Sequence, residues 1–486
     1  METFILVFYF ISLLILFSFG IHSLVLVHFL RKYDTKKTPE YPLPEPDKLP
    51  IATIQIPFYN EQYVAERLVR SVCSMNYPID KLEIQVLDDS TDETQAILKK
   101  CVEEYSSQGF NIKYLHRTNR AGFKAGALKA GLEVAEGEFI AIFDADFLPN
   151  PDFLIKTIPQ FTDPNVGMVQ TRWEHLNEEY SYITKAQALS LDGHFAVEQY
   201  SRFKTGCFIN FNGTAGIWRK SCIIDAGNWQ SDTLTEDLDL SYRAQMKGWK
   251  FVYLNNVTSP AELPLDINAL KTQQFRWTKG AIETARKLLP TLLKSKLPTK
   301  IKLEGIIHLT SNIVYPFILI VALLNLPVVV IKNYTSAYDT FYAVMSIFVL
   351  ASISTFLFYT FAQQTIHHDW RKRLLLFPLF MAGSMGFAVN NTKAVIEALI
   401  GKKSSFTRTP KVGIIGANLH QPQKTNIYHA RKIHKTAIVE LLFALYFVVC
   451  VGVSIYYVEI AAIPFQLMFL LGFGIVGFLS LKEAYQ

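Results

Sequence analysis

Residues 139–146 of this 486-residue chain read Phe-Ile-Ala-Ile-Phe-Asp-Ala-Asp, an apolar run that ends in two aspartates. Three similar apolar runs, rich in β-branched residues, precede it at 51–56, 82–87 and 111–115. Helix-like stretches separate the runs, at about 61–75, 91–107 and 124–135. Such alternation of strand and helix predicts an α/β domain with a mostly parallel, doubly wound sheet.

Carboxylates follow three of these four predicted strands. Glu61 comes shortly after the first strand, Asp89 follows the second, and Asp144 and Asp146 follow the fourth. Ligands of such sheets bind at the carboxyl ends of the strands. Alternate residues of a strand face the same side, so Asp144 and Asp146 predict a hard-oxygen site for Mg²⁺ or Mn²⁺ that would hold substrate phosphates. The alternative is a strand-end turn whose carboxylates are solvated.

Three further polar segments stand out. Lys124 lies among small residues at a predicted helix start, which suits either an anion or plain solvation. Thr235-Glu236-Asp237 forms a polar turn before the helix-like stretch 238–247. In Gln273-Gln-Phe-Arg276-Trp277, the arginine can clamp a diphosphate and the tryptophan can stack on a sugar. The alternative for this last segment is an amphipathic helix that lies on the membrane.

The chain also has the composition of a membrane protein. It is 50% hydrophobic and 19% charged, with a mean hydropathy of +0.18, a net charge of +6 and a pI near 8.8. Residues 4–30 carry no charge and are long enough to span a bilayer. Four basic residues follow within seven positions, so the positive-inside rule puts residue 31 onward in the cytosol.

Further spans are predicted at 305–330, 341–363, 436–457 and 459–481. Both 367–373 and 402–435 are basic and should be cytosolic, so an even number of crossings separates them. We therefore expect 374–400 to lie at the interface or to re-enter, which gives five spans with the N-terminus outside. Six spans with one basic loop outside is the alternative.

The five cysteines form no Cys-x-x-Cys pair and stand near no histidine at zinc-ligand spacing. We expect reduced, structural thiols and no zinc site.

Taken together, Asp89, Asp144-x-Asp146, Thr235-Glu236-Asp237 and Gln273-x-x-Arg276-Trp277 resemble the signature of processive family-2 glycosyltransferases, which include the cellulose, chitin and hyaluronan synthases. The resemblance is closest to plant cellulose-synthase-like proteins of the mannan and glucomannan synthase (A) and xyloglucan-backbone (C) groups. It runs from about residue 50 to 290, and is carried by Gln55–Glu61, Gln85–Asp92, Phe123–Leu128, Ala141–Phe147, Phe211–Arg219 and Gly248–Tyr253.

The resemblance implies roles for individual residues. Asp237 would be the general base, within the Thr235-Glu236-Asp237 turn, and Asp144 and Asp146 would hold the metal. The donor nucleotide would be bound by Tyr59, Glu61, Asp89, Lys124, Asp144, Asp146, Gln273 and Arg276. The acceptor sugar would meet Trp277, Phe211, Asn212 and Gly213. Phe406, Arg408, Thr409 and Lys411 resemble a gating loop, with Arg408 in place of the valine found in bacterial cellulose synthases.

The same resemblance implies a GT-A fold, Rossmann-like and mostly parallel, joined to an α-helical transmembrane region of about five spans with interface helices. We expect an N-terminal transmembrane helix over 1–32, a cytoplasmic glycosyltransferase domain over 33–300, and a transmembrane channel over 301–486 with a cytosolic gating-type loop at 402–435. The location would be a bacterial inner membrane, a plasma membrane or an equivalent.

The implied activity is transfer of glucose or mannose from UDP-glucose or GDP-mannose, with Mg²⁺ or Mn²⁺, to a growing β-linked polysaccharide that is then translocated. One alternative is a non-processive enzyme that glycosylates a lipid such as ceramide or diacylglycerol. Another is a transporter with a nucleotide-sensing domain, which leaves Thr235–Asp237 and Gln273–Trp277 unexplained. No nucleic-acid partner is expected.

Overall fold

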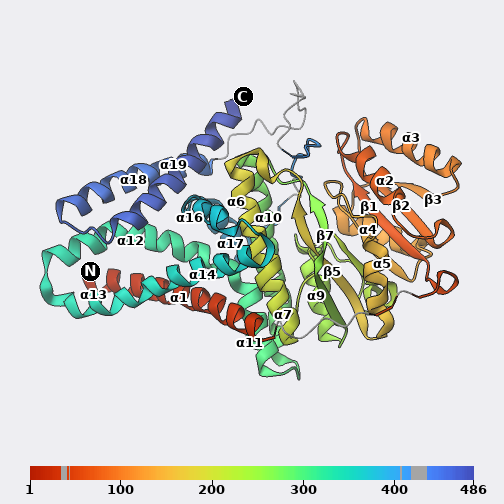
Figure 1. Ribbon diagram of the computed structural model, residues 1–486. Coiled ribbons are helices and arrows are strands. Elements are labelled where there is room, and N and C mark those ends of the chain that lie inside the picture. Colours follow the sequence, from red (N-terminus) through yellow and green to blue (C-terminus); the bar gives the residue numbers. More distant parts are fainter. Residues whose placement is uncertain (34–40, 43, 405–407, 417–434, 486) are drawn as a thin grey trace.

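A computed structural model describes residues 1–33, 41–42, 44–404, 408–416 and 435–485. The molecule has two parts that lie side by side (Figure 1). One is a sheet covered by helices, and the other is a bundle of long apolar helices. Helix α10 (Ile267–Lys294) runs between the two parts.

The sheet has seven strands in the order β3-β2-β1-β4-β6-β5-β7. The four predicted strands are confirmed as β1 (Ala52–Phe58), β2 (Leu82–Asp88), β3 (Asn111–His116) and β4 (Phe139–Ile142), which pair in parallel. The predicted helices between them are α2 (Ala65–Cys73), α3 (Thr94–Ser107) and α4 (Phe123–Val134). The mostly parallel, doubly wound arrangement is therefore confirmed.

Apolar residues of β4 are buried on both faces of the sheet, as expected for a strand between two helical layers. Ala141 and Phe143 join the core that includes α2 and α3. Ile140 and Ile142 join the opposite core, which includes Trp218. The continuous apolar run at 139–143 is explained by this two-sided burial.

Three strands lie outside the predicted runs: β5 (Val166–His175), β6 (Gly216–Arg219) and β7 (Lys250–Ala261). β6 is antiparallel to both β4 and β5. It has only four residues, and β7 is an edge strand with register shifts against β5, so neither presents a clean alternating pattern. Helix α9 (Glu236–Met246) precedes β7 in the chain, and α10 follows it.

Five helical segments are long and apolar enough to cross a membrane, and they match the five segments predicted as spans. They are α1 (Glu2–Tyr33), α11 and α12 together (Thr299–Tyr334), the segment Ser336–Ile366, α18 (Thr436–Tyr456) and α19 (starting at Ile463). Their outer faces carry exposed leucine, valine and phenylalanine side chains, which suits contact with lipid.

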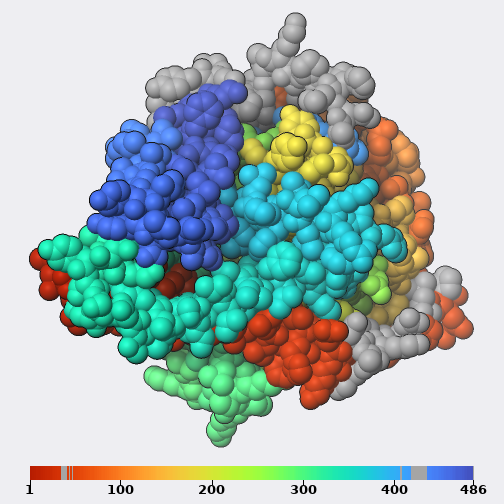
Figure 2. Space-filling view, turned by 60° about the vertical axis from the view of Figure 1, so that its left-hand side comes forward, coloured from red at the N-terminus to blue at the C-terminus, as the bar shows by residue number. Residues whose placement is uncertain are grey.

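The doubtful segment 374–400 forms two helices, α16 (Phe377–Gly386) and α17 (Ala388–Leu399). The helix pair that contains them is bent by 43°, the geometry of a broken span or a re-entrant loop. In Figure 2 this cyan segment lies between the blue C-terminal helices and the orange part of the sheet domain. The helices themselves are compatible with five or with six crossings.

A buried ion pair fixes α10 to the membrane helices. The Nζ of Lys271 lies 2.8 Å from a carboxylate oxygen of Glu440 in α18, and both side chains are 0% exposed. The same ammonium lies 3.2 Å from Ser480 Oγ of α19. Glu483 of α19 accepts the backbone N–H groups of Ile267 and Asn268 at the start of α10. The orientation of α10 is thus set by charged contacts from the bundle.

We expect Lys271→Met to destabilise the protein by about 3–5 kcal/mol, because it leaves the Glu440 carboxylate buried without its cation. The measurement is the thermal unfolding midpoint in detergent. The double variant Lys271→Met/Glu440→Leu removes both charges and should recover most of the loss. A double variant as unstable as the single one would contradict this account of the pair.

Candidate active site

The carboxyl ends of β1, β2 and β4 open onto a cavity that α9, α10 and the segment 408–411 close from the other side. Seventeen predicted site residues line it, although they come from distant parts of the sequence. They are Tyr59, Glu61, Asp89, Lys124, Asp144, Asp146, Asn212, Gly213, Thr235, Glu236, Asp237, Gln273, Arg276, Trp277, Arg408, Thr409 and Lys411.

Asp144 and Asp146 lie just beyond β4, which ends at Ile142. The two aspartates were expected after the strand, facing one side by strand alternation, and the structure places them in the irregular turn that follows it. Both carboxylates still line the cavity, because the turn is held there. The backbone N–H of Asp144 donates to Thr214 Oγ1 at 2.9 Å, next to β6.

Each of these carboxylates contacts a lysine from another element. Lys124 Nζ lies 2.5 Å from Asp144 Oδ1, and Lys411 forms an ion pair with Asp146. Burial opposes the charge on both lysines, but the neighbouring carboxylates outweigh it and raise the pKa of each. The cavity therefore holds a compact, alternating set of negative and positive groups.

Lys124 reaches the cavity because α4 begins abruptly. Gly122 has a φ of +72°, in the left-handed region that favours glycine. A Cβ at Gly126 would lie 2.0 Å from the carbonyl oxygen of Ala121, so only glycine fits there. Lys124 Nζ also donates to the carbonyl oxygen of Gly213 at 2.8 Å. The small residues around Lys124 thus serve a tight helix start, which confirms the predicted placement of the lysine.

Asp237 lies in the first turn of α9, where the helix dipole favours negative charge. Burial, together with the charge of Glu236, raises the pKa of Asp237 to about 7. Burial likewise raises the pKa of Glu236. Thr235 packs on α10 at Gly280, where a Cβ would come within 2.5 Å of the threonine methyl group. The acidic turn is therefore seated directly on the helix that carries Arg276.

A second group of contacts lies at the ends of β1 and β2. The guanidinium of Arg120 lies over the ring of Tyr59, 3.3 Å from its centroid. Arg117 binds both oxygens of Asp89, with Nε–Oδ1 at 2.8 Å and Nη2–Oδ2 at 2.5 Å. Neither arginine was predicted, although both follow β3 and so obey the rule that located the carboxylates.

Glu61 lies beside this group, and its side chain is 14% exposed. Burial raises the pKa of Glu61 to about 7, in spite of the guanidinium of Arg408 at 3.4 Å. The nearby carboxylate of Asp146 contributes in the same direction. A cation that entered this part of the cavity would be favoured by Glu61 as well as by the aspartates.

The segment 408–413 crosses the mouth of the cavity. Thr409 Oγ1 lies 3.2 Å from Arg276 Nη2. The backbone N–H groups of Val412 and Gly413 donate to the carboxylate of Glu262, at 2.9 and 3.0 Å. Glu262 was missed because it follows β7, a strand that the sequence pattern did not reveal. The gating-type residue Phe406 lies outside the described residues.

The acceptor-side prediction holds only in part. Asn212 and Gly213 line the cavity, but Phe211 does not. Its ring is 0% exposed and packs edge-on against Trp218, with centroids 5.6 Å apart. Successive residues of an extended segment point to opposite sides, so when Asn212 faces the cavity, Phe211 belongs to the core.

The donor set suits a hard divalent cation. Asp144 and Asp146 offer carboxylate oxygens, which Mg²⁺ and Mn²⁺ prefer, and substrate phosphates would complete the coordination. Among the described residues, no group of three or more His, Cys, Asp and Glu side chains is arranged to hold a metal by itself.

Two family profiles match the chain: glycosyl transferase family 2 over residues 53–223, and glycosyl transferase family group 2 over residues 139–388. Glucomannan 4-beta-mannosyltransferase 1 of Oryza sativa subsp. japonica is 41% identical over 300 residues, which cover 59% of this chain and 56% of that enzyme. Glucomannan 4-beta-mannosyltransferase 7 of Arabidopsis thaliana is 32% identical over 450 residues, 88% of this chain and 77% of that enzyme.

The chain spans about half the length of the first of these relatives. A solved mannosyltransferase of Pyrobaculum calidifontis, in complex with GDP-Man and Mn²⁺, superposes with a TM-score of 0.58 over 82% of this chain and 100% of that one. At 18% identity this likeness shows the shared GT-A fold alone. Fold, profiles and long alignments agree, and the chain belongs to glycosyl transferase family 2.

Proposed function

We propose that this chain is an inverting hexosyltransferase that adds mannose from GDP-mannose to a growing β-linked polysaccharide. The observation that carries the proposal is the convergence of Asp237, with its raised pKa, and the Asp144–Asp146 turn on one cavity. A single base with a diphosphate site opposite it is what one-step displacement at an anomeric carbon needs.

On the donor side, the positive charges of Lys124 and Arg276 line the cavity where a diphosphate would lie. Arginine and lysine bind phosphate oxygens through charge-assisted hydrogen bonds. Asp144 and Asp146 would hold the Mg²⁺ or Mn²⁺ ion, which when bound neutralises charge on the leaving diphosphate. Tyr59 and Asp89 would bind the nucleoside at the ends of β1 and β2.

On the acceptor side, Asp237 accepts the proton of the attacking hydroxyl group. The hydroxyl oxygen then forms a bond to the anomeric carbon while the bond from that carbon to the diphosphate oxygen breaks. A carboxylate whose pKa lies near the working pH is a stronger base than an ordinary aspartate. Trp277, beside it in the cavity, offers a ring face for a sugar.

The plant relatives are 4-beta-mannosyltransferases, which favours mannose over glucose as the transferred sugar and a β-1,4 linkage in the product. The GDP-Man and Mn²⁺ bound by the archaeal protein support the same donor and a divalent metal. We further propose that the catalytic domain is cytoplasmic, because Arg31 and Lys32 follow the first span. The helical bundle would let the polar product cross the bilayer, which it cannot do unaided.

The experiment that tests the proposal is donor-dependent release of nucleotide by the purified protein. GDP-mannose, UDP-glucose, GDP-glucose and UDP-N-acetylglucosamine are compared with Mg²⁺ and with Mn²⁺. Release with GDP-mannose, and a product digested by β-mannanase, is the expected result. A product that partitions into organic solvent would instead assign a glycolipid, and release with none of the donors would overturn the proposal.

Asp237→Asn should lower kcat by about 10²–10⁴-fold, because it removes the base while keeping the shape of the side chain. Binding of GDP to the same variant, measured by calorimetry, should stay within about threefold of the wild type. Turnover like that of the wild type would remove Asp237 from the base role.

The pH profile gives a control for this assignment. Since burial and Glu236 raise the pKa of Asp237 to about 7, kcat should fall about tenfold per pH unit below that value and level off above it. The residual rate of Asp237→Asn should lack this acidic limb. If the limb persists in the variant, Glu61, whose pKa is also about 7, is its source.

Asp146→Ala should weaken donor binding at least tenfold, and only when a divalent metal is present, because the aspartate is a proposed metal ligand. Isothermal titration with GDP-mannose, with and without Mn²⁺, measures both arms. Asp163→Ala serves as a control, since this carboxylate pairs with Lys250 on the surface. Full activity of the wild type in EDTA would contradict the metal assignment.

Lys411→Ala should raise the KM for the donor about tenfold, since Lys411 and its neighbours Arg408 and Thr409 would close over the diphosphate. Steady-state kinetics measures this change. Lys402→Ala is the matched control, because that lysine pairs with Glu397 instead of reaching the cavity. If the donor KM were the same for the two variants, residues 408–413 would form a structural loop that does not act as a gate.

A further inference from the structure

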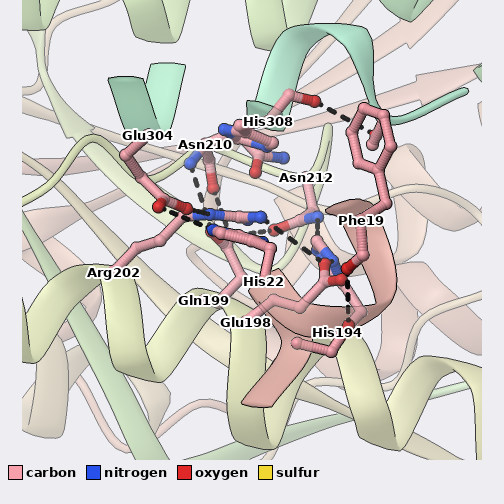
Figure 3. Close-up of polar contacts among 12 residues, drawn as sticks. Phe19, His22, His194, Glu198, Gln199, Arg202, Asn210, Asn212, Glu304 and His308 are labelled. Carbon is pink, nitrogen blue, oxygen red and sulfur yellow. Dashed lines mark hydrogen bonds and ion pairs between the residues drawn. The ribbon is translucent and has the colours of Figure 1, made fainter. Parts of the chain in front are cut away.

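A chain of polar side chains, most of them outside the recognised motifs, leads from the cavity to the membrane helices (Figure 3). It begins at Asn212, which lines the cavity. The Nδ2 of Asn212 lies 2.9 Å from His194 Nε2, and its Oδ1 accepts a hydrogen bond from Gln199 Nε2 at 2.8 Å. His194 and Gln199 are the first and last residues of a π-helical turn, an irregularity that is frequent at functional sites.

The hydrogen bonds fix the orientation of every group in this chain. Gln199 Oε1 accepts the backbone N–H of Asn210, so its amide nitrogen must face Asn212 Oδ1. Asn212 therefore turns its NH₂ group toward His194, whose Nε2 must accept. The imidazole proton then lies on Nδ1, where it is donated to Glu198 Oε2 at 2.9 Å.

The far end of the chain is anchored in the bundle. Glu198 lies 3.9 Å from Arg202, whose Nε donates to Glu304 Oε1 at 2.9 Å. The other oxygen of Glu304 lies 2.8 Å from His22 Nε2 of α1. Burial alone would raise the pKa of Glu198, but the hydrogen bond from His194 and the charge of Arg202 hold it below its usual value. Glu198 is thus an ionised acceptor.

The near end of the chain adjoins the proposed base. Gly213 follows Asn212, and a Cβ built on it would lie 3.1 Å from Asp237 Oδ2. The carbonyl oxygen of Gly213 accepts from Lys124. The backbone next to Asn212 therefore lies close to the proposed base. An amide nitrogen carries two hydrogens, and His194 uses one, so the second is available to a ligand in the cavity.

We propose that His194, backed by Glu198, is a positioning residue that holds the Asn212 amide as a hydrogen-bond donor to a hydroxyl group of the acceptor sugar. This inference rests on the proposed function. On this view His194 and Glu198, which lie apart from the donor site, determine where the acceptor sugar is held. Misplacement of a contact by about 1 Å can lower the rate about 100-fold, so loss of the His194 contact to the Asn212 amide should have a measurable effect.

The test compares His194→Leu, His194→Gln and the wild type with GDP-mannose and mannotetraose. His194→Leu should lower acceptor-dependent kcat/KM at least tenfold, while slow hydrolysis of the donor without acceptor and GDP binding stay within about twofold. His194→Gln offers an oxygen to the Asn212 amide and should regain most of the loss. Tyr242→Phe is the matched control, since it removes the bond to His308 nearby without touching Asn212.

A double-mutant cycle keeps the test decisive if His194→Leu is also less stable. Asn212→Ala/His194→Leu should be no worse in acceptor-dependent kcat/KM than Asn212→Ala alone. Additive losses, or a His194→Leu that reduces donor hydrolysis and transfer in equal proportion, would overturn the inference. A wild type that hydrolyses and transfers no donor would overturn the proposed function itself, which is a separate result.

Discussion

The gathering of several carboxylates in one cavity is the constraint on which the rest of the structure depends. Asp144, Asp146, Glu236 and Asp237 all line it, and carboxylates held this close repel one another unless cations lie among them. Their cations come from far along the chain: Lys124 from α4, Arg276 from α10 and Lys411 from beyond α17. Charge balance therefore requires three remote segments to meet at the sheet edge, and it leaves the cavity suited to a ligand that carries both a diphosphate and a metal ion.

Helix α10 turns this local requirement into a link with the membrane bundle. Its first turns are held by Lys271, Glu440 and Glu483, and its next turns present Gln273, Arg276 and Trp277 to the cavity. Further along, Lys279 pairs with Glu397 of α17, 3.4 Å away. One side of the site is therefore fixed by the sheet and the other by helices of the bundle, so that the relation of the two parts determines the shape of the cavity.

Local hydrophobic patterns in the sequence predict four of the seven strands and the membrane spans. The strands at 51–56, 82–87 and 139–143 are buried on both faces and have apolar sequences, whereas the edge strand at 111–115 is only partly buried. The five spans follow from hydropathy. β6 and β7 carry no such pattern, because one is very short and the other is an irregular edge. Asp89, Asp144 and Asp146 meet as expected because strand ends converge by topology, whereas Asp237 and Arg276 reach the cavity from helices α9 and α10. His194 and Glu262 were not foreseen, because their partners Asn212 and Gly413 are chosen by tertiary contacts alone.

The division of the site also bears on how a polymer would grow in it. In the proposed reaction, donor contacts would come from Tyr59, Asp89 and the Asp144–Asp146 turn at the sheet edge, and from Arg276 on α10. Acceptor contacts would come from Trp277 on α10 and from Asn212, whose amide is tied through His194 and Arg202 to Glu304 at the start of a membrane span. After each transfer, the lengthened polymer must move away from Asp237 by one sugar unit, and a new donor molecule must enter the nucleotide site. Because Arg276 and Trp277 both lie on α10, which is anchored to the bundle, a shift of the bundle against the sheet would move a diphosphate contact and an acceptor contact together.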